Sequence, residues 1–100
     1  MAKTEVREEV WQFMSVVRRE SGVLGGGQAT LVRTVFLGAH HQNSLCAVYF
    51  RPDLFDALGL KAGKKYKLTL RRETFVAEGH SSADSAPVDV AESALAVQKQ

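Results

Sequence analysis

Cationic side chains are the residues of this chain whose spacing most clearly indicates a chemistry. Residues 65–71, with the sequence KYKLTLR, alternate in polarity, so cations at odd positions share one face of a predicted strand. These cations are Lys65, Lys67 and Arg71, and Lys64 lies in the turn before them. A row of ammonium and guanidinium groups suits the binding of phosphates. The same row also suits a solvated strand face that resists edge pairing, and the sequence leaves both interpretations open.

Other predicted strands supply further cations and the aromatic rings. The cations are Arg18, Arg19, Arg33 and Arg51. An exposed ring lets a base of a single nucleic-acid strand stack on it, which is worth about 1 to 3 kcal/mol per base. The candidate rings are Trp11, Phe13, Phe36 and Tyr49.

Tyr49 is the strongest of these candidates. It alternates with Val48 and Phe50, which we expect to face the core, and Phe50 replaces it if that assignment is inverted. A small domain also needs aromatic side chains inside, so core positions for Trp11 and Phe13 remain the alternative. We assign four rings to the core, namely Phe36, Phe55, Tyr66 and Phe75.

The histidines and the single cysteine are the only residues that suggest a metal site or a catalytic one. They are His40, His41, His80 and Cys46. Adjacent histidines in an extended segment point apart, and no second cysteine completes a tetrahedral set. Cys46 lies in an apolar run, where a buried and inert thiol is expected. We therefore expect no metal, no cofactor and no enzymatic activity.

Composition and charge indicate one small domain with an uneven charge distribution. The 100 residues carry a formal net charge of +2. Residues 21–79 hold eight basic and four acidic side chains, whereas residues 80–100 hold one basic and three acidic ones. One cysteine forms no internal disulfide, and no apolar run approaches the roughly 20 residues of a membrane span. We expect a cytoplasmic protein that does not enter a membrane.

The middle of the chain predicts a strand, a short helix and a second strand. Residues 45–51 are rich in β-branched and aromatic side chains, and Pro52 ends the run. Asp53 is a candidate cap for a helix over residues 54–58, and Gly59 is a candidate end for it. Residues 65–71 form the next strand. Residues 73–77 either extend that strand or form a fifth one.

The first twenty residues allow two interpretations. Val6, Val10, Phe13 and Val17 fall on one stripe of a helix, while residues 10–17 also alternate as in a strand. The glycine-rich loop at residues 25–27 and the β-rich run at residues 29–37 favour a strand, because together they make a long hairpin. A helix remains the alternative.

Residues 80–100 are small and polar, contain Pro87 and lack aromatic side chains. This composition is typical of a flexible acidic tail. A short helix over residues 90–97 is the alternative. The domain boundary is thus expected at residue 79, with a folded domain over residues 1–79 and a tail over residues 80–100.

Two segments resemble the OB-fold single-stranded DNA-binding proteins of phages, plasmids and bacteria. RRESGVLGGGQATLVRTVFLG is similar to their first hairpin, and AVYFRPDLFDALGLKAGKKYKLTLR is similar to their strand, helix and strand unit. The resemblance implies a mainly β protein, a five-stranded OB-like barrel with one short helix between the third and fourth strands. The tail lacks the aspartate-rich, proline-phenylalanine ending of the bacterial proteins, so the resemblance does not imply partner recruitment through it.

The resemblance also implies a function. We expect binding of single-stranded DNA, or of RNA, with little sequence preference, through a basic groove and aromatic stacking. A homodimer or higher oligomer and a role in DNA replication are expected with it. The expected contact residues are Trp11, Arg18, Arg19, Arg33, Tyr49, Arg51, Lys64, Lys65, Lys67 and Arg71.

Two other functions fit the same sequence. Residues 58–64, with the sequence LGLKAGK, also resemble the turn of swapped-hairpin transcription factors, which bind duplex DNA as dimers. A protein-binding adaptor or inhibitor from a mobile element would instead use the basic face against an acidic protein and the aromatics as hot spots.

Overall fold

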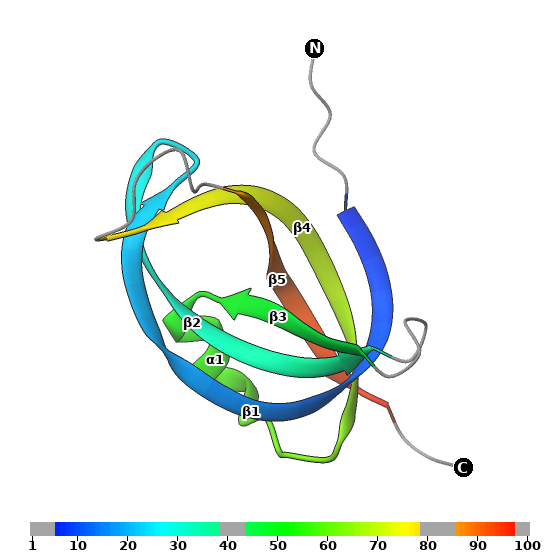
Figure 1. Ribbon diagram of the computed structural model, residues 1–100. Coiled ribbons are helices and arrows are strands. Elements are labelled where there is room, and N and C mark those ends of the chain that lie inside the picture. Colours follow the sequence, from blue (N-terminus) through cyan, green and yellow to red (C-terminus); the bar gives the residue numbers. More distant parts are fainter. Residues whose placement is uncertain (1–5, 39–43, 79–85, 98–100) are drawn as a thin grey trace.

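A computed structural model describes residues 6–38, 44–78 and 86–97 of the chain. Five strands close into a barrel in the order β1-β2-β3-β5-β4, with a short helix between β3 and β4 (Figure 1). The elements are β1 (Val6–Leu24), β2 (Gly27–Gly38), β3 (Ser44–Phe50), α1 (Pro52–Leu58), β4 (Lys65–Ala77) and β5 (Ala86–Ala96). The prediction of a mainly β, five-stranded OB-like barrel with one helix after the third strand is confirmed.

The strand interpretation of the first segment is correct. β1 pairs with β2 from Trp11 to Leu24, with register shifts that leave Met14 and Val17 without a partner in β2. Each such bulge bends a strand and increases its twist, which lets β1 follow the wall of the barrel (Figure 1). Val10 and Phe13 of the helical stripe lie on opposite faces of β1, because they are three residues apart and both bulges come after Phe13. Val6 and Val17 are nearly half exposed, and the stripe that favoured a helix is not buried together.

Of the two alternatives for residues 73–77, the extension of the fourth strand is correct, and the fifth strand lies further along the chain. Residues 73–77 continue β4, and the fifth strand is β5, which pairs with β4 from Ala86 to Ala96 and with β3 at three positions. The prediction of a tail over residues 80–100 is therefore wrong for residues 86–96, and the alternative helix is wrong as well. Residues 79–85 and 98–100 lie outside the described part.

Small side chains explain why β5 escaped prediction. Ala91 and Ala94 are almost fully buried, and they pack against larger apolar side chains in the barrel. The stability that these alanines contribute comes from packing against partners elsewhere in the chain, and local β propensity does not reveal it. Pro87 lies one residue inside the start of β5, where a missing amide donor is tolerated.

The buried apolar side chains form two clusters, one on each face of the sheet. The first core is made of Trp11, Phe13, Val32, Phe36, Val48, Phe50, Tyr66, Leu68, Leu70, Ala91 and Ala94. The second core is made of Leu24, Leu31, Tyr49, Phe75 and Val90. Neighbouring residues of one strand, such as Tyr49 and Phe50, contribute to different cores because their side chains point to opposite faces. At this place the sheet is therefore covered on both faces.

The tip of the β1–β2 hairpin contributes part of the second core. Residues 22–24 of β1 pair with residues 75–77 of β4, which places Leu24 beside Phe75. The strands approach closely at Gly22, where an added Cβ would lie 2.1 Å from the carbonyl oxygen of Val76. Only glycine fits at this contact.

The short helix matches the prediction at its end but not at its start. Arg51 is the N-cap residue and makes no side-chain capping bond, Pro52 opens the helix, and Asp53 lies in the first turn. Gly59 closes the helix with φ 58°. Proline explains the start, because its fixed φ suits the first helical turn.

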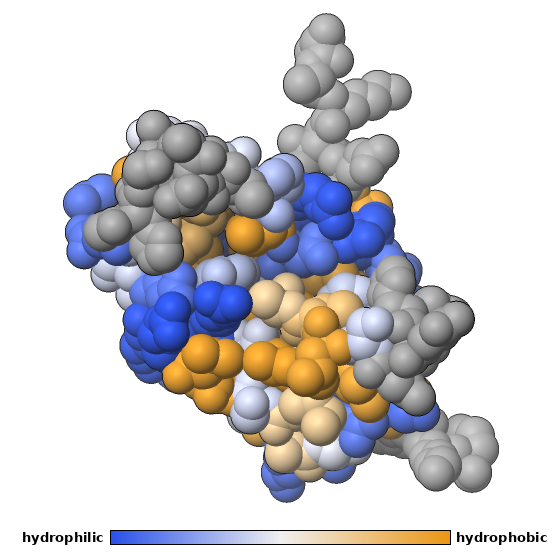
Figure 2. Space-filling model, in the orientation of Figure 1, coloured by the Kyte–Doolittle hydropathy of each residue, from blue (hydrophilic) through white to orange (hydrophobic). Residues whose placement is uncertain are grey.

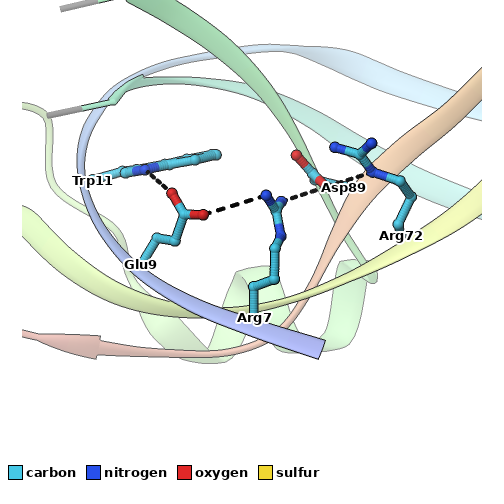
Figure 3. A network of polar contacts seen from close by, with 5 residues as sticks. All are labelled: Arg7, Glu9, Trp11, Arg72 and Asp89. Atoms are coloured by element: carbon cyan, nitrogen blue, oxygen red, sulfur yellow. Dashed lines mark hydrogen bonds and ion pairs between the residues drawn. The ribbon is translucent and has the colours of Figure 1, made fainter. Parts of the chain in front are cut away.

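A polar network joins β1, β4 and β5 (Figure 3). Arg7 donates to Asp89 at 2.8 Å and pairs with Glu9 at 3.3 Å, and the Trp11 indole N–H donates to Glu9 at 2.9 Å. Arg72 lies 3.6 Å from the same Asp89 carboxylate. Arg7, Glu9 and Trp11 alternate along β1 and thus share its inward face. The network holds three strands together beside the first core.

Candidate nucleic-acid interface

The outer face of β1, β2 and β3 consists of three cross-strand rows. Residues directly opposite in antiparallel strands share a face, so the pairing register defines each row. The first row is Gln12, Leu37 and Leu45, the second row is Ser15, Val35 and Ala47, and the third row is Arg18, Arg33 and Tyr49. Successive rows lie about 7 Å apart, because they are two residues apart along β2. The face is uncharged over two rows and cationic at the third.

The third row brings together three residues that the sequence had proposed. Arg18 and Arg33 lie directly opposite each other, and both approach one carboxylate oxygen of Glu20. Arg18 Nε is 2.9 Å and Arg33 Nη1 is 3.6 Å from Glu20 Oε2. The Glu20 side chain is only 9% exposed, whereas those of Arg18 and Arg33 are 58% and 38% exposed. The two guanidinium groups thus face solvent while their counterion is buried.

Tyr49 of β3 lies directly opposite Arg33 of β2 in this row. The guanidinium carbon of Arg33 is 6.0 Å from the centre of the Tyr49 ring, at the outer limit of a cation–π contact. Partial burial raises the pKa of the Tyr49 phenol, Arg33 opposes that rise, and Glu20 adds to it. The phenol therefore stays neutral at physiological pH.

The first and second rows form an aliphatic surface. Leu45 is 67% exposed, Ala47 is exposed, and Val35 and Leu37 are half-buried. Met14 and Val17, the bulged residues of the adjoining β1, are exposed as well. Figure 2 shows hydrophobic side chains gathered over the middle of this side of the barrel, next to a strongly hydrophilic area.

A second group of cations lies at the turn between α1 and β4. Lys61, Lys64 and Lys65 are exposed and have no carboxylate partner among the described residues. The turn is fixed to β1 by two backbone hydrogen bonds with Phe13, from Gly63 at 2.8 Å and to Lys64 at 2.9 Å. The Gln12 amide donates to the Gly63 carbonyl at 3.1 Å. Since Gln12 belongs to the first row, these lysines adjoin the uncharged end of the face.

The remaining predicted cations are partly neutralised. Lys67 and Arg71 project from β4 away from the core as predicted, but Lys67 pairs with Glu8 at 3.4 Å and Arg71 with Glu92 at 2.6 Å. Arg19 pairs with Asp56 of α1 at 3.6 Å. The predicted site residues therefore belong to separate surfaces, of which the third row is the most compact group.

Arg51 is exposed but belongs to neither cationic group described above. It lines an open pocket of about 310 Å³ between α1, β4 and β5, together with Leu54, Glu73 and Glu92. The two acidic side chains of this pocket make it a poor place for a phosphate. Arg51 is therefore left out of the candidate interface.

Exposed aromatic rings are missing from the interface. All eight aromatic residues of the chain lie in the described part; seven are buried and Phe55 is half-buried. The prediction that Trp11 and Tyr49 present open faces is wrong, since their residues are 2% and 6% exposed. Tyr49 does point away from Val48 and Phe50 as predicted, but the second core covers it. Trp11 occupies its alternative position in the first core.

Glu20 is the residue that the sequence did not single out. It falls two positions after Arg18, and its partner Arg33 is on another strand. The register that joins them runs without a bulge from the hairpin tip at Leu24 and Gly27 to the pair of Arg18 and Arg33, and alternation along one strand does not reveal it. A cross-strand alignment of the predicted hairpin was the one signal that could have placed the three side chains together.

The fold defines a class, the OB-like barrels, whose second and third strands and adjoining loops form a recurrent oligonucleotide-binding surface. No protein-family model matches the chain, and searches of curated proteins and of solved structures find no match. Among the described residues no three His, Cys, Asp or Glu side chains come close enough to hold a metal ion. The one helix in this part of the chain is too short to cross a bilayer.

Proposed function

We propose that the protein binds single-stranded nucleic acid, DNA in the first place and RNA as the alternative, across the outer face of β1, β2 and β3. The observation that carries the proposal is the third row, where Arg18 and Arg33 converge on one anion at the surface that OB barrels use for oligonucleotides. A fold alone does not determine a function, so the placement of these arginines is the stronger support.

The mechanism is electrostatic. Arg18 and Arg33 contact phosphates at one end of the face, and the lysines of the α1–β4 turn contact them at the other. Phosphate contacts carry no sequence information, so the binding has little sequence preference. For a single strand each neutralised phosphate contributes about −0.7 to the slope of log K against log salt. The two arginines and three lysines together therefore give a slope of about −3.5. Stacking contributes little because the rings are buried.

A salt titration tests this proposal. A labelled oligo(dT) and a duplex of equal length are titrated with protein at about 50 and about 200 mM salt, and binding is followed by anisotropy. Tight, salt-sensitive binding to the single strand is expected, with a large loss in an Arg18→Ala/Arg33→Ala variant. Lys67→Ala is the matched control, because Lys67 pairs with Glu8 away from the face. Absence of binding to both nucleic acids refutes the proposal.

Duplex preference in the same titration would instead support the duplex-binding regulator. The turn that suggested it, residues 58–64, connects α1 to β4 within one closed barrel. A swapped hairpin would have to open that barrel. The proposed role in replication and the cytoplasmic location stay predictions.

A second candidate function, docking of a protein partner, is favoured by the aliphatic rows. Leu45 is 67% exposed in the first row of an uncharged surface, and large apolar patches mark interaction sites. A second copy of the chain, as the expected homodimer, is one such partner. Light scattering of Leu45→Asp tests it against Leu95→Asp, a matched control at a leucine of β5 that is 66% exposed. A monomeric wild type, or equal behaviour of both variants, rejects self-association through this face.

A further inference from the structure

Two arginines occupy directly opposite positions on β1 and β2 in the third row. Like charges at opposite positions of an antiparallel pair destabilise a sheet unless an anion lies between them. In the free protein Glu20 supplies that anion, with one oxygen at 2.9 Å from Arg18 and 3.6 Å from Arg33. The arrangement of two guanidinium groups around one oxyanion is also the arrangement that binds a phosphate.

We propose that Glu20 is a built-in competitor of the ligand, which occupies the phosphate subsite of Arg18 and Arg33 until a phosphodiester replaces it. This inference rests on the proposed function and adds its regulation. The ligand class is the backbone phosphate of a single nucleic-acid strand. Glu20 lowers the affinity for that strand and holds the two guanidinium groups around its own carboxylate in the free protein.

The burial of the three side chains supports this role. The Glu20 side chain is 9% exposed because the next residue pair on the same face of the hairpin, Glu20 and Leu31, borders the second core. The arginines reach outward from it and are 58% and 38% exposed, so a phosphate approaches them from solvent without unfolding the hairpin. Each guanidinium has five N–H donors, and rotation of its long side chain transfers them from carboxylate to phosphate.

Two effects of removing the Glu20 charge follow from this arrangement. Affinity for a single strand rises, because the arginines no longer have to leave a carboxylate. The free protein loses stability, because the opposed arginines lose their anion, and a bound strand restores that stability by linkage. A carboxylate with a purely structural role produces the loss of stability without the gain in affinity.

Glu20→Gln tests the proposal, since glutamine keeps the shape and removes the charge. Glu8→Gln is the matched control. Glu8 is likewise a β1 glutamate in an ion pair, with Lys67, but it lies beside β4 and is 59% exposed. The affinity for oligo(dT) is measured at two salt concentrations, together with the thermal shift that saturating oligo(dT) produces. Circular dichroism confirms that each variant is folded.

Glu20→Gln is expected to bind oligo(dT) roughly threefold more tightly than wild type, as suits the loss of two partly exposed ion pairs. Its salt slope is steeper by about 0.7 for each added phosphate contact, and its thermal shift is larger. The gain disappears in an Arg18→Ala/Glu20→Gln/Arg33→Ala variant. Wild-type binding with no difference between Glu20→Gln and Glu8→Gln overturns this inference alone. Absence of binding by wild type and by Glu20→Gln overturns the proposed function as well.

Discussion

Asp89→Asn removes the charge that joins β5 to β1 and β4. In the wild type one carboxylate oxygen accepts from Arg7 at 2.8 Å and lies 3.6 Å from Arg72 (Figure 3). Asparagine keeps the size of the side chain but leaves both guanidinium groups with a weaker acceptor. A hydrogen bond to a charged group contributes about 1.5 to 3 kcal/mol. Because Arg7 and Arg72 are 35% and 57% exposed, solvent screening reduces the expected loss of unfolding free energy to about 1 to 2 kcal/mol.

Urea denaturation followed by Trp11 fluorescence measures this loss. Trp11 is the single tryptophan of the chain, and its indole donates to Glu9 in the same network. Glu92→Gln is the control on the same strand, because Glu92 is 40% exposed and pairs with Arg71 outside the network. The control is expected to lose at most about 0.5 kcal/mol. Equal stability of Asp89→Asn and Glu92→Gln would refute the stabilising role that we assign to Asp89 in this network.

Three further predictions concern the strands and the tyrosine. A chain that ends at residue 85 lacks β5 and should lose cooperative unfolding in urea, since β3 and β4 then have no common neighbour; an unchanged transition would contradict the barrel order. Gly22→Val should lower the unfolding free energy by about 1 to 3 kcal/mol through overpacking against Val76, with Gly27→Val, whose added Cβ meets only the Leu24 carbonyl oxygen at 4.0 Å, as the sterically open comparison in thermal melts. The folded state holds the Tyr49 proton longer than the unfolded state, so its stabilising contribution is complete below the unfolded pKa of about 10 and is lost as pH rises through the higher folded pKa. Tyr49→Phe should therefore flatten the alkaline fall in stability, and an identical fall in both proteins would show that Tyr49 has no part in it.

Local alternation predicted the strands that bury one face. Tyr66, Leu68 and Leu70 are all buried, as their spacing in residues 65–71 indicated, and the glycine-rich loop correctly joined two long strands. Tyr49 points in the predicted direction. In each case the pattern depends on neighbours within a few residues, which a single sequence displays.

Features that depend on distant partners were missed. Ala91 and Ala94 have little β propensity, and their burial depends on large side chains from other strands. The neutralising partners of Lys67 and Arg71 come from β1 and β5, so their charges looked free in the sequence. Tyr49 is covered because the hairpin tip reaches β4, a contact that joins residues 22–24 to residues 75–77. None of these contacts follows from alternation along one strand.

The closure of the barrel has a consequence for how fast the chain folds. Val6 pairs with Arg71, 65 positions later in the sequence, and Tyr49 pairs with Val90, 41 positions later. The entropy of closing such long loops must be lost before the contacts stabilise the chain, and β barrels of this kind fold in milliseconds to seconds. Until β5 is in place, β3 and β4 present unpaired edges that other chains can join. Aggregation during synthesis is therefore expected to fall when the chain is produced slowly or at low concentration.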